Sequence, residues 1–263
     1  MSVRATATGA GKVEAPRGGA APVAACVRAQ TRAELNMTLR QGERVLITVI
    51  LPAFFLVFFA STNIVPAGMG KPVDFLLPGM LAVAIMSTGM VSLGIATAYD
   101  RYYGVLKRLG SSPLPRWGLI VAKLLAVLAV EVGQIVLLVL LAVLFFGWRP
   151  AGPLWSAAPI VLLGTAAFAG LGMLMAGALR ATTTLAGANG LYILFLAIGG
   201  VILPTNHLPP VITWVANLLP AAALSDALRG ALTTQGMHGG SVLLLVFWAV
   251  VILAAAVRTF KWE

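Results

Sequence analysis

Residues 99–117 have the sequence YDRYYGVLKRLGSSPLPRW and separate two long apolar runs. The segment carries one acid, Asp100, and four cations: Arg101, Lys107, Arg108 and Arg116. Residues 100–109 contain no proline, so they can form a short helix with one apolar side. That side consists of Val105, Leu106 and Leu109. Pro113 and Pro115 end the helix, because proline lacks a backbone donor and restricts the residue before it. Such a basic helix and turn is either a surface for a partner or a solvated loop.

The overall composition places the flanking runs in a membrane. Of the 263 residues, 60% are hydrophobic and only 10% are charged, whereas a soluble domain has roughly 25% charged residues. Apolar runs of about 20 residues cross a bilayer as helices, because their backbone polar groups must be satisfied internally. The sequence therefore predicts an all-α integral membrane protein. The net charge of +10 lies beside the apolar runs, so we expect contact with membrane lipid and not with nucleic acid.

We predict six transmembrane helices and one membrane domain. The spans are expected at about residues 45–60, 75–98, 118–146, 158–179, 185–203 and 241–257. Residues 1–22 are expected to form a disordered tail, and residues 23–263 the membrane domain. Lysine and arginine are concentrated on the side of the termini, which predicts that both termini are cytoplasmic in the cell membrane. Lys123, near the start of the third span, is expected to extend toward the membrane surface.

Two features outside the spans have helical patterns. Before the first span, four arginines recur at multiples of four, which predicts a basic amphipathic helix in the membrane interface or a solvated helix. They are Arg28, Arg32, Arg40 and Arg44. Between the fifth and sixth spans, residues 203–232 contain two apolar segments that are too short to span and are separated by Pro220. They predict an external re-entrant or interfacial hairpin, whose second helix carries Asp226 and Arg229 at a spacing of three.

Polar and small residues within the spans are candidates for function or packing. Glu131 lies near the middle of the third span, and Gln134 follows one turn later. A charged side chain at the bilayer centre costs about 2.5 kcal/mol or more. Glu131 and Gln134 therefore line a translocation path, or a protonated Glu131 joins helices through hydrogen bonds, with Gln134 as one partner. In the fourth span, the pairs Ala166/Gly170 and Gly172/Ala176 predict close packing of helix backbones.

The order of these motifs resembles the type-two exporter family of ABC transporter permeases, including permeases of the daunorubicin-resistance kind. The first matching stretch contains Gly104, the run Leu106-Lys107-Arg108-Leu109 and Ser112-Pro113. The second contains Pro204, Leu208-Pro209, Pro220 and Arg229. Two departures occur: Asp100 stands where a glutamate is usual, and Tyr102-Tyr103 replace a more charged pair.

The resemblance implies a partner for the polar segment. It would be the coupling helix that docks on an ATPase subunit, and the amphipathic helix would flank the same subunit. The implied coupling residues are Asp100, Arg101, Gly104, Leu106, Lys107, Arg108 and Leu109. The chain has no G-x-x-x-x-G-K-[ST] stretch. ATP and magnesium would therefore be bound by a separate polypeptide, and no cofactor by this chain.

The residue types and motifs of the sequence give no indication that this chain catalyses a reaction. No G-x-S-x-G or H-E-x-x-H motif occurs. One cysteine excludes an internal disulfide, and the two histidines are too few for a metal site. By resemblance, we expect the permease subunit of an exporter for a drug-like or lipid-like amphiphile, with polysaccharide as the second choice. It would pair with a second copy or a related permease. The alternatives are a membrane enzyme or accessory subunit acting alone, with Glu131 as its acid, and a proton-coupled carrier.

Overall fold

The structure is a computed structural model that describes residues 22–62, 71–110, 114–202, 209–233, 236 and 239–259. The predictions for residues 1–21, Ser112-Pro113, Pro204 and Leu208 concern residues outside these ranges. The helices in chain order are α1 (Val23–Arg40), α2 (Gly42–Ser61), α3 (Pro72–Ile85), η1 (Met86–Ser92), α4 (Leu93–Tyr102), α5 (Val105–Gly110), α6 (Arg116–Phe146), η2 (Leu154–Ala157), α7 (Ala158–Ala178), α8 (Ala181–Ile198), α9 (Pro210–Leu218), α10 (Pro220–Leu232) and α11 (Gly239–Thr259).

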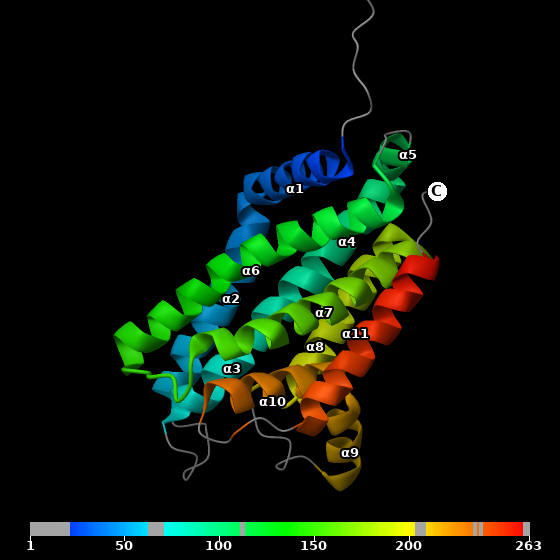
Figure 1. Ribbon diagram of the computed structural model, residues 1–263. Coiled ribbons are helices and arrows are strands. Elements are labelled where there is room, and N and C mark those ends of the chain that lie inside the picture. Colours follow the sequence, from blue (N-terminus) through cyan, green and yellow to red (C-terminus); the bar gives the residue numbers. More distant parts are fainter. Residues whose placement is uncertain are drawn as a thin grey trace, which may run out of the picture.

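The helices form a bundle with two different ends (Figure 1). We call the end that contains α1, α5 and the adjoining parts of α4 and α6 the basic end. The opposite end contains α9, α10 and the adjoining parts of α3 and α8, and we call it the hairpin end. α11 begins at the hairpin end and runs toward the basic end.

Most of the predicted spans coincide with long apolar helices in the structure. Within the described ranges, five helical segments are long and apolar enough to cross a membrane: Pro72–Tyr102, Trp117–Phe146, Leu154–Ala178, Ala181–Ile198 and Gly239–Arg258. They correspond to the second through sixth predicted spans. The first predicted span lies in α2, whose apolar part, Thr48–Ser61, is shorter. α9 and α10 would supply a sixth span if they were counted together, but they are bent by 78°, as expected of a re-entrant hairpin. The all-α membrane fold is confirmed.

One long helix forms the centre of the bundle. α3, η1 and α4 continue into one another over Pro72–Tyr102, and most of this segment is buried. It packs against α2, α6, α7, α8 and α10. Its middle part, Met86–Ser92, is a π-helix, which the sequence did not predict. Short π-helical stretches are frequent at functional sites.

Glycine lets this central helix approach α7 backbone to backbone. A Cβ atom on Gly94 would lie 2.9 Å from the Cα atom of Gly172, and one on Gly172 would lie 2.7 Å from the carbonyl oxygen of Met90. A side chain at either position would therefore force the two helices apart. Gly170 faces α11 instead, where a Cβ atom would lie 3.1 Å from Ile252. The predicted close packing of the fourth span is confirmed.

The predicted amphipathic helix is α1, and it packs along the start of α6. Val27 and Glu34 of α1 are buried. The arginines at positions 28, 32 and 40 are exposed, as the helical spacing predicted. Its position in a membrane interface remains a prediction.

Candidate functional site

The polar segment at the basic end is divided by Gly104. α4 ends at Tyr102, and α5 begins at Val105. Gly104 has a φ of 71°, a backbone conformation that glycine adopts at little cost and that commonly ends helices. The prediction of one helix over residues 100–109 was therefore wrong. Its residues lie on two helices with a turn between them. Space around Gly104 is open, so its backbone conformation, and not a close contact, requires glycine there.

Leu106 faces the interior of this chain. It is only 1% exposed and belongs to a small apolar cluster at the basic end. The other buried members are Val27, Leu114, Leu119 and Ala122, with Leu109 packed against them. Leu106 therefore anchors α5 to α1 and α6. The expectation that Leu106 offers its apolar surface to a partner was wrong, because α1 already covers it.

The outer side of the segment presents aromatic and basic side chains. Tyr102 is 72% exposed and Tyr103 is 68% exposed, and Lys107 is also exposed. The rings of Tyr102 and Tyr103 meet edge to face with centroids 5.2 Å apart, and Tyr99 stacks on Tyr103 at 6.1 Å. The packed rings form an apolar projection on a segment that Leu106 anchors to α1 and α6.

The charged pair that precedes the turn is engaged within the chain. Arg101 donates hydrogen bonds to the carbonyl oxygens of Gly177 and Leu179, at the end of α7. A cation at this position satisfies terminal carbonyls and complements the helix dipole. Asp100 accepts a hydrogen bond from Nζ of Lys123 at 3.0 Å. Both residues therefore join the turn to spanning helices.

Lys123 connects three helices through a buried ion-pair network, which we call the Lys123 node. Its Nζ atom lies 2.9 Å from Oε1 of Glu34 on α1 and 3.0 Å from Oδ2 of Asp100 on α4. Lys123 is only 1% exposed, so its expected extension to the membrane surface was wrong. A buried ammonium requires carboxylate partners, because its desolvation is costly. One signal of this pairing was visible in the sequence: a lysine at the eighth position of the largely apolar α6.

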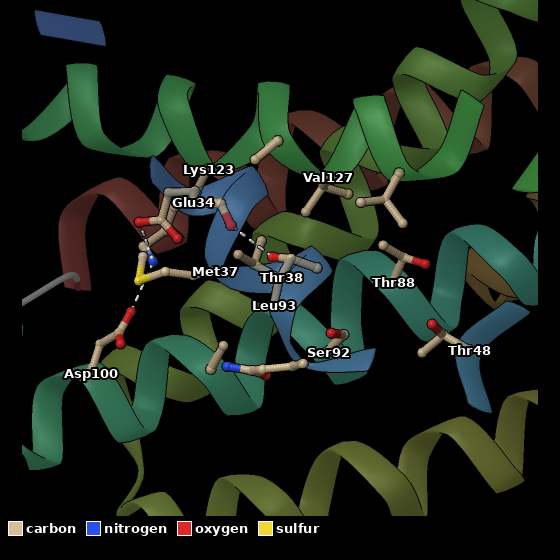
Figure 2. Close-up of a pocket in the computed structure, with 14 residues that line it drawn as sticks. Glu34, Met37, Thr38, Thr48, Thr88, Ser92, Leu93, Asp100, Lys123 and Val127 are labelled. Carbon is tan, nitrogen blue, oxygen red and sulfur yellow. Dashed lines mark hydrogen bonds and ion pairs between the residues drawn. The ribbon is translucent and has the colours of Figure 1, made fainter. Parts of the chain in front are cut away.

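A cavity of about 70 Å³ adjoins the Lys123 node (Figure 2). It lies between α1, α2, η1, α4 and α6. The polar part of its lining includes Glu34, Asp100, Lys123, Ser92, Thr88 and Thr48. The apolar part includes Met37, Leu93, Ala126, Val127 and Val130. Figure 2 shows Lys123 between the two acids, with the hydroxyl side chains farther along the cavity.

Glu131 and Gln134 are both buried, but they do not bond to each other. Gln134 accepts a hydrogen bond from the hydroxyl of Thr88 at 3.0 Å and donates to the carbonyl oxygen of Thr48 at 3.1 Å. Glu131 accepts a hydrogen bond from the hydroxyl of Thr165 on α7 through Oε2. Its Oε1 atom has no hydrogen-bond partner within the described ranges. The expected pairing of Glu131 with Gln134 was wrong; a role in translocation stays a prediction.

Arg229 fixes the hairpin end. Pro209 precedes α9, and Pro220 begins α10. Arg229 of α10 is 6% exposed and lies 3.9 Å from the ring centroid of Phe75. It donates hydrogen bonds to Asp226 at 2.9 Å, which confirms the predicted spacing of three, and to carbonyl oxygens of other segments. These belong to Gly200, Val201 and Phe75.

Metal binding receives no support from the part of the chain that the structure describes. No group of three His, Cys, Asp or Glu side chains comes together there. The two acids of the Lys123 node share an ammonium instead.

Comparison with known proteins identifies the family to which this chain belongs. Residues 26–233 match the ABC-2 type transporter family. The chain is 28% identical over 203 residues to the "Putative transport permease YvfS" of Bacillus subtilis (strain 168), covering 73% of this chain and 79% of that protein. It is 25% identical over 209 residues to "ABC transporter G family member 20" of Dictyostelium discoideum, covering 74% of this chain and 28% of that longer protein. With most of its length matched, the chain belongs to the ABC-2 type transporter family and is a multi-pass transport permease of an ABC transporter.

Proposed function

We propose that this chain is the membrane subunit of an ATP-driven exporter. It would move a drug-like or lipid-like amphiphile out of the cytoplasm or the inner leaflet. A separate ATPase subunit would bind ATP and magnesium, and a second copy of the chain or a related permease would complete the path. The basic end would face the cytoplasm, because the cations are concentrated there.

The exposed tyrosines supply the observation that carries this proposal. Tyr102 and Tyr103 are exposed at the basic end beside Lys107, while the buried Leu106 packs the segment against α1 and α6. Tyrosine is enriched among the residues that dominate the energy of protein interfaces. We therefore place the ATPase contact on the two rings, with Lys107 at the polar rim. This revises the contact expected from the sequence, in which Leu106 was the apolar anchor.

The Lys123 node gives this surface a mechanical connection to the bundle. Asp100 lies one helical turn before Tyr103 and is bonded to Lys123 of α6, which also pairs with Glu34 of α1. Arg101 joins the same turn to the end of α7. A displacement of the turn by an ATPase would therefore be transmitted to α1, α6 and α7.

The proposal is tested by replacing Tyr103 with alanine and measuring which ATPase activity stays with the purified permease. Loss of an interface anchor of this kind costs about 2 kcal/mol, which is roughly 30-fold in affinity. We expect vanadate-sensitive ATP hydrolysis to be lost from the purified Tyr103→Ala protein. The matched control is Trp155→Ala, which removes a 76% exposed aromatic ring near the hairpin end. Equal hydrolysis with the two variants would contradict the proposed contact.

A further inference from the structure

The cavity beside the Lys123 node has an excess of negative charge. Two of its lining residues are carboxylates, Glu34 and Asp100, and Lys123 is the cation among the described lining residues. The exposed fraction of the side chain is 1% for Lys123, 11% for Glu34 and 26% for Asp100, so solvent screens these charges less than it would at a fully exposed surface. One carboxylate charge therefore remains without a countercharge in the described lining.

Each acid also keeps one oxygen available for a further hydrogen bond. Oε1 of Glu34 accepts from Lys123 and from Gln30, and Oδ2 of Asp100 accepts from Lys123. The second oxygens, Oε2 of Glu34 and Oδ1 of Asp100, have no partner in the part of the chain that the structure describes. An ionised carboxylate only accepts hydrogen bonds. A guest at this position must therefore carry N–H or O–H donors, and the charge excess favours a cation.

The rest of the cavity limits the size and the polarity of the guest. A volume of about 70 Å³ corresponds to roughly two water molecules at about 30 Å³ each, which suits an ammonium group and the first one or two methylenes but not a sugar. Leu93, Val127 and Val130 supply an apolar wall beyond the acids. Met37 is partly exposed at the same cavity, and methionine adapts to apolar groups of different shapes.

We propose that this cavity binds the ammonium head of a single-chain cationic amphiphile. Asp100 and Glu34 accept hydrogen bonds from the ammonium, and the first methylenes lie along Leu93 and Val127. Its identification as cargo rests on the proposed function, whereas the binding itself does not. Because Asp100 also joins the turn to α6, an occupied cavity would lie directly against the segment that we assign to the ATPase.

Binding is tested with tritiated dodecylamine on the full chain in phosphatidylcholine nanodiscs, without any ATPase, and with empty nanodiscs subtracted. We expect saturable binding that Asp100→Asn weakens at least 10-fold. Asp74→Asn removes the same charge from the start of α3 at the hairpin end and should leave binding unchanged. Glu34→Gln and the cavity-filling Val127→Phe provide independent variants, and each is compared only if it elutes as the parent protein does.

Competition with unlabelled ligands shows whether the charged head or the alkyl chain of the probe is responsible for its binding. Unlabelled dodecylamine should displace the probe, while dodecanol, with the same chain but no charge, should not. Ethylamine, with the same head but only two carbons, should displace it only at much higher concentrations. Displacement by dodecanol would overturn the charged site, and displacement by ethylamine at the same concentration as dodecylamine would overturn the amphiphilic guest. Equal binding by Asp100→Asn and Asp74→Asn, or no saturable binding, would overturn the site altogether. A permease that retains an ATPase on purification but binds no dodecylamine would refute this inference alone. A permease that binds dodecylamine but never co-purifies with an ATPase would refute the proposed function alone.

Discussion

Among the described residues, each end of the molecule buries one cation, and the two cations have different hydrogen-bond partners. Lys123 at the basic end is held by two carboxylates from α1 and α4. Arg229 at the hairpin end is held mainly by backbone carbonyls and the ring of Phe75, with Asp226 as a partly exposed partner. Lysine offers a compact charge, whereas arginine offers a planar fork with fixed donor directions.

The two ends also differ in how closely the chain packs around the buried cation. Carboxylate side chains can rotate and exchange one cation for another, and a cavity adjoins them at the basic end. Carbonyl oxygens are fixed by their backbone, and a Cβ atom at Gly79 would lie 2.2 Å from the carbonyl oxygen of Val201, so the hairpin end has no spare room there. The hairpin end is therefore packed more closely around its cation than the basic end, where a cavity adjoins the two acids.

The largest expected effect is that of Lys123→Met. It leaves two carboxylates without their cation, and removing one partner of a buried pair costs about 3–5 kcal/mol. We expect a clear fall in the thermal unfolding temperature in detergent. Adding Glu34→Gln and Asp100→Asn to Lys123→Met should restore most of the loss, because no uncompensated charge then remains. If the single and the triple variant unfold alike, the Lys123 node is not the source of the stability.

Arg229→Lys should have a smaller effect, because the charge is kept and only the planar fork is lost. The carbonyl oxygens of Gly200 and Val201 would lose donors, at about 1–3 kcal/mol for buried groups left unsatisfied. Thermal unfolding followed by size-exclusion chromatography measures the change. Arg149→Lys, at an exposed site near the same end, is the control and should be neutral. An unchanged unfolding temperature for Arg229→Lys would mean that charge alone holds the hairpin.

Gly104→Ala tests the turn at the basic end. The φ of 71° costs an alanine about 1–2 kcal/mol, although its Cβ atom would meet open space. Gly104→Asn should cost less, because asparagine tolerates this conformation better. Gly133→Ala is the control, since its surroundings are also open and it lies within a helix, where alanine is favoured. Equal stability of Gly104→Ala and Gly133→Ala would remove the conformational explanation.

Glu131→Gln lies between the two ends and should have the smallest effect on stability. Glutamine keeps an acceptor for Thr165 and the same shape, so we expect a change of about 1 kcal/mol or less. If Glu131 lines the path, transport of a fluorescent amphiphile in proteoliposomes should nevertheless fall while ATPase retention is unchanged. Normal transport by this variant would leave Glu131 with a packing role only.

Five of the six predicted spans coincide with helices of the described ranges that are long and apolar enough to cross a membrane, because apolar length and helical spacing are local properties. The third predicted span, residues 118–146, differs from α6 by two residues at its start, and Asp226 and Arg229 pair as their spacing indicated. Contacts between distant segments could not be predicted in this way. Leu106 is buried only because α1 packs over it, and Lys123 is buried only because Glu34 and Asp100 meet there.

Photo-crosslinking from the basic end tests the central claim most directly. We would place p-benzoylphenylalanine at Tyr103 or at Trp155, irradiate membranes and probe the products with a photoreactive ATP analogue. We predict an ATP-binding crosslinked product from position 103 and none from position 155. An ATP-binding product from position 155, or none from position 103 in membranes where ATP hydrolysis co-purifies with the permease, would contradict the claim that the basic end is where the ATPase docks.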